Sequence, residues 1–549
     1  MKKRRIIASL LAFTIGATTL AGCGDSSQPS PSSGSEAGPA TSSAASVDTA
    51  SAEFSYPVNT GETLTYWCEL STNVSPNFTS LGDTPFGKGW IERTGINIEF
   101  QHPPTGQQQE QFSLLVADGN LPDLIEYPWL IYPGGPQKAI DDGNIHALND
   151  IMDQYCPNLK AYLEANPEVD KMIKTDSGNY YLFPFIRGDK ILQSTIGLFL
   201  RKDWLDELDM EVPETIDEWH TVLTAFKEQK GAIAPLSYEY TMGALTEVLP
   251  FTLAYNTSKM FYVGSDSKVH FGAIEPGYKE FLQTFNQWYK EGLIDQDLGT
   301  LALDQVSAKM TNGSAGASVG WAGSRMGVWT AAAKESDPGY ELVPTKIPVI
   351  NKGDIPEMGT LQNPYPNQGG VAISTSCKNV ELAARLMDYA YSPEGHMYFN
   401  FGIEGESYNM VEGYPTYTDV ILNNPNGWPI AQSMSAYIRG NYNGPFVQDV
   451  RYLEQYYTLD GQKISGELWA YGNGAKHILP TITPTTEESK EFAVIMNEIN
   501  TYRDEMTLKF ILGTESIDNF DAYVKTIENM NIARAIEIQN GALERFYNR

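Results

Sequence analysis

Thr63-Leu64-Thr65-Tyr66-Trp67 alternates polar and apolar side chains, which is typical of a β-strand, and residues 96–100 repeat the pattern. A third strand is predicted at Pro122-Asp123-Leu124-Ile125-Glu126-Tyr127. Between these strands, residues 87–94 and 110–118 have the spacing of helices. The order strand, helix, strand, helix, strand favours parallel strands joined by helices. The opening of the chain therefore predicts an α/β fold.

The loops after these strands are candidates for a binding site, because loops at the carboxyl ends of parallel strands meet at one edge of the sheet. The first strand ends at Trp67 and is followed by Glu69. The third ends at Tyr127 and is followed by Trp129. We therefore expect these four side chains along one edge.

A helix start is predicted at residue 216. Thr215 has the side chain of an N-cap, and Glu218 stands three residues later, as a capping box requires. The apolar positions that follow, up to residue 226, have helical spacing.

The N-terminus has the pattern of an export signal. Four basic residues at 2–5 precede an apolar run at 6–20, which ends in Leu20-Ala21-Gly22-Cys23. The run is too short to span a bilayer comfortably, and small residues before Cys23 resemble a lipobox. We therefore predict a lipoprotein signal peptide at 1–22 and a diacylglycerol anchor on Cys23. The alternative is an ordinary signal peptide beside an unrelated cysteine.

Residues 23–61 are rich in Ser, Gly, Pro, Ala and Thr, so we predict a flexible tether there. The whole chain has 38 Lys and Arg against 68 Asp and Glu, a formal net charge of −30. Such a charge repels nucleic acid and anionic lipid head groups. No run after the signal is long and apolar enough to cross a membrane. We therefore predict a body outside the cytoplasm, held to the cell membrane only through Cys23, with no nucleic-acid partner.

Cysteine and histidine give little sign of a metal or cofactor. Cys68, Cys156 and Cys377 form no Cys-x-x-Cys pair, and their spacing allows one disulfide without identifying it. We expect at least one of them to be a buried thiol. The six histidines are isolated from one another in the sequence. We expect neither a metal nor a cofactor.

Several segments together resemble one known family. They are residues 114–124 (LLVADGNLPDL), 200–205 (LRKDWL), 212–219 (VPETIDEW), 400–408 (NFGIEGESY) and the close from 512 to 547. In this order they are similar to the extracellular solute-binding proteins of carbohydrate ABC importers, family 1, especially the large lipoproteins of Gram-positive bacteria. The resemblance covers the chain from about residue 62 to its end.

The resemblance implies a two-lobe α/β fold of the type II periplasmic-binding-protein kind, with crossing strands at the hinge and a ligand cleft between the lobes. By analogy, lobe 1 comprises residues 62–195 and 341–401, and lobe 2 comprises 196–340 and 402–549. The protein would be a monomer at the extracellular face of the membrane. It would capture an oligosaccharide or sugar derivative and deliver it unaltered to an ABC permease.

A pyranose has an apolar face and a ring of hydroxyls, so it needs aromatic platforms and planar hydrogen-bonding groups. Trp321 is the leading candidate, because it follows a run of small residues as the stacking tryptophan of related sugar-binding proteins does. The alternative is that it packs between helix and sheet. Further candidates are neighbouring Arg325, the four edge residues named above (Trp67, Glu69, Tyr127 and Trp129), Tyr365 and Tyr408 in loops, and Arg187. Arg187 could donate to hydroxyls or to a uronate, or pair with an acidic side chain.

Two other functions remain open. A cell-surface glycoside hydrolase would need two carboxylates across the scissile bond, and no acidic motif stands out. A peptide-binding or scaffold lipoprotein would show no response to sugars. Gly316-Ala317-Ser318-Val319-Gly320 fits the G-x-S-x-G pattern of hydrolases but lacks an oxyanion motif and an obvious histidine partner.

The sequence also argues against a calcium loop and against a polyanionic ligand. Many relatives carry a calcium loop at the position of residues 228–235, but this chain lacks clustered oxygen ligands there. No cluster of basic residues appears in the sequence, which favours a neutral ligand over a polyanion.

Overall fold

The structure is a computed structural model that describes residues 54–240, 250–366, 369–439 and 443–549. Residues 55–549 form one unit and are described here by themselves. The predicted signal peptide, Cys23 and residues 23–53 of the predicted tether lie outside the described residues.

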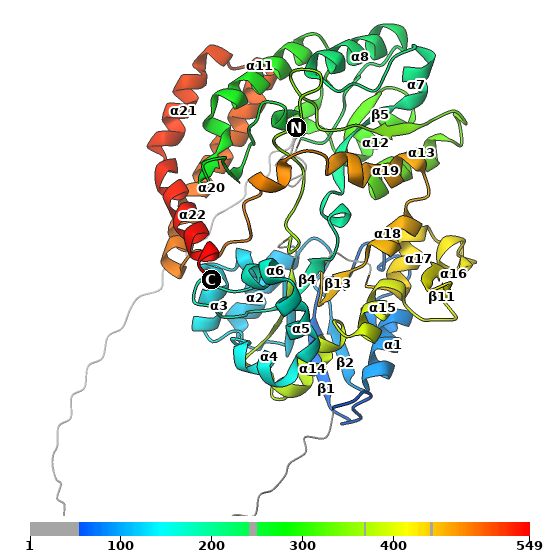
Figure 1. The fold of residues 1–549 in the computed structure, drawn as a ribbon, viewed down its shortest axis with the longest axis vertical. Helices are drawn as coiled ribbons and strands as arrows, with labels where there is room; N and C mark the ends of the chain where they lie inside the picture. The colour runs from blue at the N-terminus through cyan, green and yellow to red at the C-terminus, as the bar shows by residue number, and fades with distance from the viewer. Residues whose placement is uncertain (1–53, 241–249, 367–368, 440–442) are drawn as a thin grey trace, which may run out of the picture. The chain divides into compact units, whose positions relative to one another are not determined.

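A six-stranded sheet contains the predicted opening of the fold (Figure 1). Strand β1 pairs in parallel with β2 on one side and β3 on the other. Helices α1 (Pro85–Thr94) and α2 (Gln108–Asp118) connect them, so the predicted order is confirmed. Across the sheet the strands run β13 (Phe446–Gln448), β4 (Phe183–Arg187), β10 (Gly370–Ile373), β3 (Leu124–Tyr127), β1 (Thr63–Trp67) and β2 (Asn97–Gln101).

A three-stranded sheet follows directly after β4. Strand β5 (Ile196–Arg201) lies at its centre and pairs antiparallel with β8 (Ala317–Trp321) and β9 (Leu342–Pro344). Gly316, just before β8, has no room for a side chain, because a Cβ there would lie 2.3 Å from the ring of Phe226. The small residues of this segment therefore let helix α8 (Ile216–Gln229) pack closely against the sheet.

Sheet membership differs from the predicted lobe boundaries at two strands. Strand β9 begins the segment 341–401 expected in lobe 1, but it pairs with β5 in the three-stranded sheet. Strand β13 is in the segment 402–549 expected in lobe 2, but it pairs with β4 in the six-stranded sheet. The division of the chain into two lobes stays a prediction.

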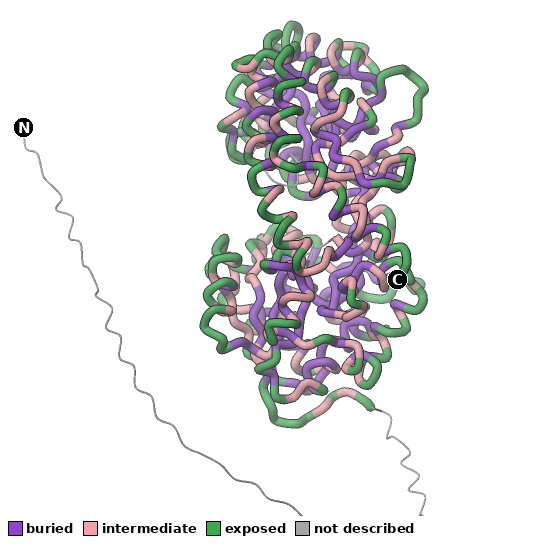
Figure 2. Tube along the Cα trace, turned by 90° about the vertical axis from the view of Figure 1, so that its left-hand side faces the viewer, coloured by how far each residue is buried: buried purple, intermediate pink, exposed green. Residues whose placement is uncertain are grey.

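Helices cover both sheets, and separate cores lie beneath them (Figure 2). Around the six-stranded sheet lie α1, α2, α3 (Gly135–Asp141), α4 (Asn149–Tyr155), α5 (Pro157–Ala165), α6 (Pro167–Met172), α14 (Val380–Tyr389) and α15 (Pro393–Phe401). The other helices that precede α14 are α7 (Lys202–Glu207), α8, α10 (Pro250–Leu253), α11 (Pro276–Lys290), α12 (Leu303–Thr311) and α13 (Val328–Ala333).

Two hairpins stand apart from these sheets: β6 (Phe261–Val263) pairs with β7 (Val269–Phe271), and β11 (Tyr408–Val411) pairs with β12 (Tyr414–Tyr417). The helices after α15 are α16 (Asp419–Leu422), α17 (Ile430–Tyr437), α18 (Val450–Tyr456), α19 (Asp460–Trp469), α20 (Thr486–Leu512), α21 (Phe520–Asn529) and α22 (Ile532–Tyr547). Helix α22 joins two cores: Ile532 and Ala535 pack in the core around the three-stranded sheet, whereas Leu543 and Phe546 pack in that of the six-stranded sheet.

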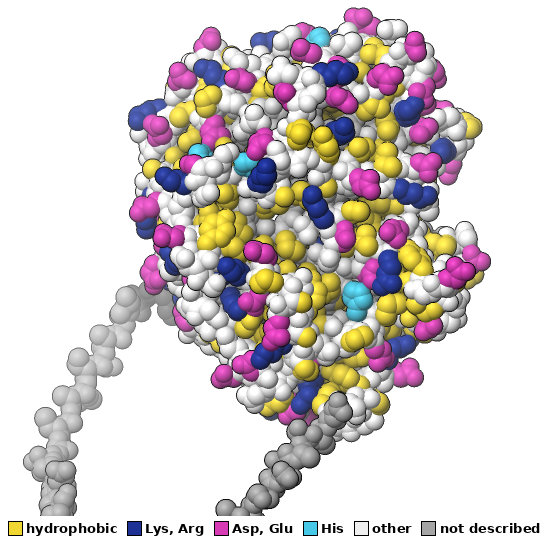
Figure 3. Space-filling view, viewed as in Figure 1, with side chains coloured by type: hydrophobic (Ala, Val, Ile, Leu, Met, Phe, Trp, Pro, Cys, Tyr) yellow, Lys and Arg dark blue, Asp and Glu magenta, His cyan; other side chains and the backbone are white. Residues whose placement is uncertain are grey.

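The surface of the face shown in Figure 3 mixes acidic, basic and hydrophobic side chains. Among the described residues, no helix combines the length and the apolar character needed to cross a lipid bilayer.

The predicted capping box at the start of α8 is confirmed. The Thr215 hydroxyl accepts a hydrogen bond from the Glu218 backbone N–H (3.1 Å), and the Glu218 carboxylate accepts one from the Thr215 N–H (3.2 Å). Two N–H groups that the helix itself leaves unpaired are satisfied in this way.

We predict that Thr215→Ala lowers the free energy of unfolding by about 1 kcal/mol, because an N-terminal cap of α8 is lost. The matched control is Thr221→Ala in the same helix, whose hydroxyl donates to the Asp217 carbonyl at an exposed position. That change should be neutral or slightly stabilising, since Ala is the better helix former. Urea unfolding followed by circular dichroism measures both, and equal losses would contradict the capping role.

Candidate functional site

A cavity of about 310 Å³ is the candidate site. This volume is at the lower end of the range for small-molecule sites. Six aromatic side chains line it: Trp321, Phe399, Phe446, Tyr452, Tyr456 and Tyr457. Hydrogen-bonding groups line it too, including Asn73, Thr195, Ser324, Asn400, Ser435 and Gln448. Two arginines, Arg187 and Arg439, complete the polar lining.

Trp321 is positioned by the end of β8 and the π-helical turn that follows it (Ala322–Gly327). The guanidinium carbon of Arg325 lies 5.5 Å from the centroid of the Trp321 ring, within cation–π range. Arg325 is itself held by Glu239, whose carboxylate accepts a hydrogen bond of 2.6 Å. The ring of Trp321 is therefore fixed by a buried ion pair, while it contributes to the cavity lining.

Arg187 and Gln448 come to the cavity on adjacent strands. They are paired in the parallel register of β4 and β13. Arg187 donates from Nη1 to the Leu192 carbonyl (2.7 Å), and Gln448 donates to the Tyr452 hydroxyl (2.7 Å). Both side chains are buried and line the cavity. The strand pairing thus presents a guanidinium and an amide side by side.

Arg439 is held by a buried acidic residue of the six-stranded sheet. Its Nη2 donates to both carboxylate oxygens of Glu126, at 2.7 Å each. The Tyr66 hydroxyl donates to the same carboxylate at 2.5 Å. Burial alone would lower the pKa of Arg439, but the Glu126 carboxylate outweighs it, so the pKa is raised above its ordinary value. Arg439 is therefore charged at the cavity wall.

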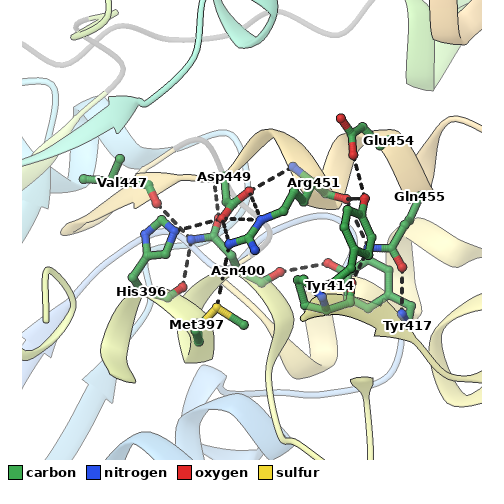
Figure 4. Close-up of polar contacts among 11 residues, drawn as sticks. His396, Met397, Asn400, Tyr414, Tyr417, Val447, Asp449, Arg451, Glu454 and Gln455 are labelled. Atoms are coloured by element: carbon green, nitrogen blue, oxygen red, sulfur yellow. Dashed lines mark hydrogen bonds and ion pairs between the residues drawn. The ribbon is translucent and has the colours of Figure 1, made fainter. Parts of the chain in front are cut away.

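Asp449 organises a second polar network (Figure 4). Its carboxylate accepts hydrogen bonds from His396 Nε2 (3.0 Å) and Arg451 Nε (3.0 Å). It also accepts from the Arg451 backbone N–H (2.9 Å), which makes it the N-cap of α18. The Asp449 N–H donates to the side chain of Asn400 (2.9 Å). One carboxylate thus orients Asn400 and the helix that carries Tyr452, and both of these line the cavity.

Burial alone would raise the pKa of Asp449. Hydrogen bonds from His396 and Arg451 outweigh this effect and hold the pKa of Asp449 well below its usual range. The network is therefore built around an ionised carboxylate at neutral pH.

The predicted edge residues after β1 and β3 do not reach the cavity. Trp67, Tyr127 and Trp129 are 6%, 3% and 0% exposed. Tyr127 stacks on Phe112 of α2 with ring centroids 3.6 Å apart, so these rings are packed in the core of the six-stranded sheet. Glu69 is half-buried, and burial followed by the nearby Glu126 charge raises its pKa.

Tyr365 and Tyr408 are also buried in cores, although they were expected to face a cleft. Of the predicted set, the structure brings Trp321 and Arg187 to the cavity, with Arg325 behind Trp321. That these predicted residues bind the ligand stays a prediction.

Sequence reasoning missed much of the cavity wall, including Arg439, Gln448 and Asn400. The spacing of Tyr452 and Tyr456, four residues apart on α18, was the one readable signal, because such residues share a helix face. The others reach the cavity through pairings between distant segments.

The three cysteines that the structure describes, Cys68, Cys156 and Cys377, are buried free thiols, so they form no disulfide with one another. Burial raises the pKa of each thiol. Among the described residues, no group of three or more His, Cys, Asp or Glu side chains is arranged to hold a metal ion.

Comparison with known proteins identifies the family of this chain. The bacterial extracellular solute-binding protein family matches residues 76–397. The chain belongs to this family, as the resemblance implied.

Individual relatives agree with this assignment. The chain is 23% identical to the fructooligosaccharide ABC transporter substrate-binding protein FusA of Streptococcus pneumoniae, over 82% of this chain and 84% of FusA. It is 23% identical to lipoprotein LipO of Bacillus subtilis, over 77% of each chain. Its fold is similar to that of the alginate-binding protein AlgQ2, with a TM-score of 0.70, 24% identity and coverage of 88% of this chain and 98% of that one.

We predict that Glu126→Ala lowers the free energy of unfolding by about 3–5 kcal/mol, because Arg439 is left charged and unpaired in the interior. The control is the double variant Glu126→Ala/Arg439→Met, which removes both charges and is measured beside the single variants Glu126→Ala and Arg439→Met. Its loss should be smaller than the sum of the two single losses. Denaturant unfolding measures this coupling, and additive losses would show that the pair does not interact.

We predict that Asp449→Asn flattens the acid dependence of stability. A carboxylate with a lowered folded-state pKa stabilises the fold above its unfolded-state pKa of about 4. That contribution is lost as the pH falls through the lower folded-state pKa. Unfolding free energies measured from about pH 6 to pH 2 should therefore fall more steeply in the parent protein than in the variant. Parallel curves would argue against an ionised Asp449 at the centre of the network.

Proposed function

We propose that the protein is the sugar-binding subunit of an ABC importer and that it captures an oligosaccharide or sugar derivative outside the cell. The observation that carries this proposal is the cavity, which combines aromatic rings with amide, hydroxyl and guanidinium groups. Rings stack on the apolar face of a pyranose and planar groups bind its hydroxyls. Membership of the solute-binding family and the likeness to FusA support it.

The proposal also covers how the protein is held at the cell surface and how it passes the sugar on. Cys23 would carry the lipid that holds the protein to the outer face of the cell membrane, and the similarity to lipoprotein LipO supports this. The two lobes would close over the sugar, and the closed monomer would be recognised by the permease.

Binding without chemical change is favoured over glycoside hydrolysis. Hydrolysis needs two carboxylates on either side of the scissile bond. Among the described residues, those that line the cavity include neither Asp nor Glu. Incubation with oligosaccharides separates the two functions: release of shorter products would support the hydrolase, and a ligand-dependent rise in melting temperature without products supports the binding protein.

We predict that Trp321→Ala weakens the affinity for the sugar by about 1–3 kcal/mol, because a stacking platform is lost. Calorimetry on a sugar found by thermal-shift screening measures the change. The matched control is Trp428→Ala, since Trp428 is also half-buried but packs against Phe78 and is not among the residues that line the cavity. Equal affinities of Trp321→Ala and the parent protein, with folding intact, would remove Trp321 from the site.

A further inference from the structure

We propose that the bound sugar carries a carboxylate, as a uronic acid does, and that Arg187 and Arg439 bind it. This inference rests on the proposed sugar-binding function and narrows its ligand class. The cavity lining supplies the first argument. Among the described residues, its charged side chains are these two arginines, and no acidic side chain lies with them on the wall.

Both arginines are built into the fold and are not flexible surface groups. Arg187 is 3% exposed and Arg439 is 4% exposed. Arg187 is fixed by its strand pairing and by its hydrogen bond to the Leu192 carbonyl. A buried, oriented guanidinium is costly to keep, and it is the side chain best suited to a carboxylate because its planar N–H groups can donate two parallel hydrogen bonds.

The acidic partner of Arg439 comes from a buried strand of the six-stranded sheet. Glu126 belongs to β3, is 1% exposed and is absent from the cavity lining. It engages Arg439 through Nη2 alone, whereas a guanidinium has five N–H donors. The pair thus holds the guanidinium in place without using all its donors.

One donor of Arg439 has no acceptor within the described part of the chain. Its Nε is buried and has no hydrogen-bond partner among the described residues. Gly444 lies against it, and a Cβ at that position would approach Nε to 2.9 Å. A buried unpaired donor is unfavourable, so the fold keeps Arg439 in this position at a cost in stability.

The strongly acidic chain does not oppose this assignment. Charges farther away than the Debye length, about 8 Å at physiological ionic strength, are largely screened. Arg187 and Arg439 are in the cavity lining itself, where screening is weak. The aromatic rings beside them would stack on the sugar ring while the arginines bind its carboxylate.

The test compares acidic oligosaccharides with their carboxyl-reduced counterparts, so that linkage and length are matched within each pair. The panel contains oligogalacturonates, alginate oligomers and glucuronate-containing oligosaccharides, together with sulfated and neutral sugars. Calorimetry on the parent protein should find an acidic member that binds at least tenfold more tightly than its reduced counterpart. The preference should persist between 50 and 500 mM NaCl with only a small decrease, because a buried ion pair is screened weakly.

Two variants separate charge recognition from stacking. Arg187→Gln should lower the acid-to-reduced affinity ratio several-fold while Arg439 maintains part of it, whereas Trp321→Ala should weaken both members of a pair by the same factor. If Arg187→Gln does not fold, the matched ligands and the salt dependence of the parent protein still decide the question.

Three other binding results would overturn the carboxylate proposal, and they differ in what they imply for the sugar-binding function. Tight binding of neutral or reduced sugars without preference for acids overturns the carboxylate proposal and leaves the sugar-binding function standing. Preference for a sulfated sugar over every carboxylated one also overturns it. Binding of no sugar at all contradicts the proposed function, and this inference with it.

Discussion

The ion pair between Glu126 and Arg439 is the contact on which the geometry of the cavity depends. Glu126 is in the middle of an apolar sheet, where an isolated carboxylate would be strongly disfavoured. Its partner lies 313 residues later in the sequence, just after α17. The pair therefore fixes the end of α17 against β3, and residues of α17 form part of the cavity wall. A buried ion pair often adds little net stability, so its main effect here is on position.

A single stretch of chain extends this wall. Strand β13 places Phe446 and Gln448 beside β4, Asp449 follows as the N-cap, and α18 then presents Tyr452 and Tyr456. Each step depends on the one before it, because the cap fixes where the helix begins and the helix sets the spacing of its tyrosines. The ionised carboxylate of Asp449 joins strand, helix and Asn400 into one unit.

Local sequence patterns were enough for the parts of the fold that repeat with a simple period. The opening strands and helices and the capping box at Thr215 were predicted because each depends on residues close together in sequence. Strand β13 has only three residues, too few to show a period, and its pairing with β4 was not predicted. Trp129 illustrates another limit: an aromatic residue after a strand is equally compatible with an edge and a core, and α2 provides Phe112 for it to pack against.

The charge of the site shows the same limit more clearly. The sequence has no cluster of basic residues, and this absence favoured a neutral ligand. Clusters of that kind are visible only when the residues are neighbours along the chain. Here Arg187 is carried by β4, whereas Arg439 follows α17 and is held by Glu126 of β3. Both guanidinium groups line one cavity because β4 and β3 belong to the same sheet. A chain with a net charge of −30 can therefore present a cationic wall to its ligand, since the sign of a site is set by the few charges inside it.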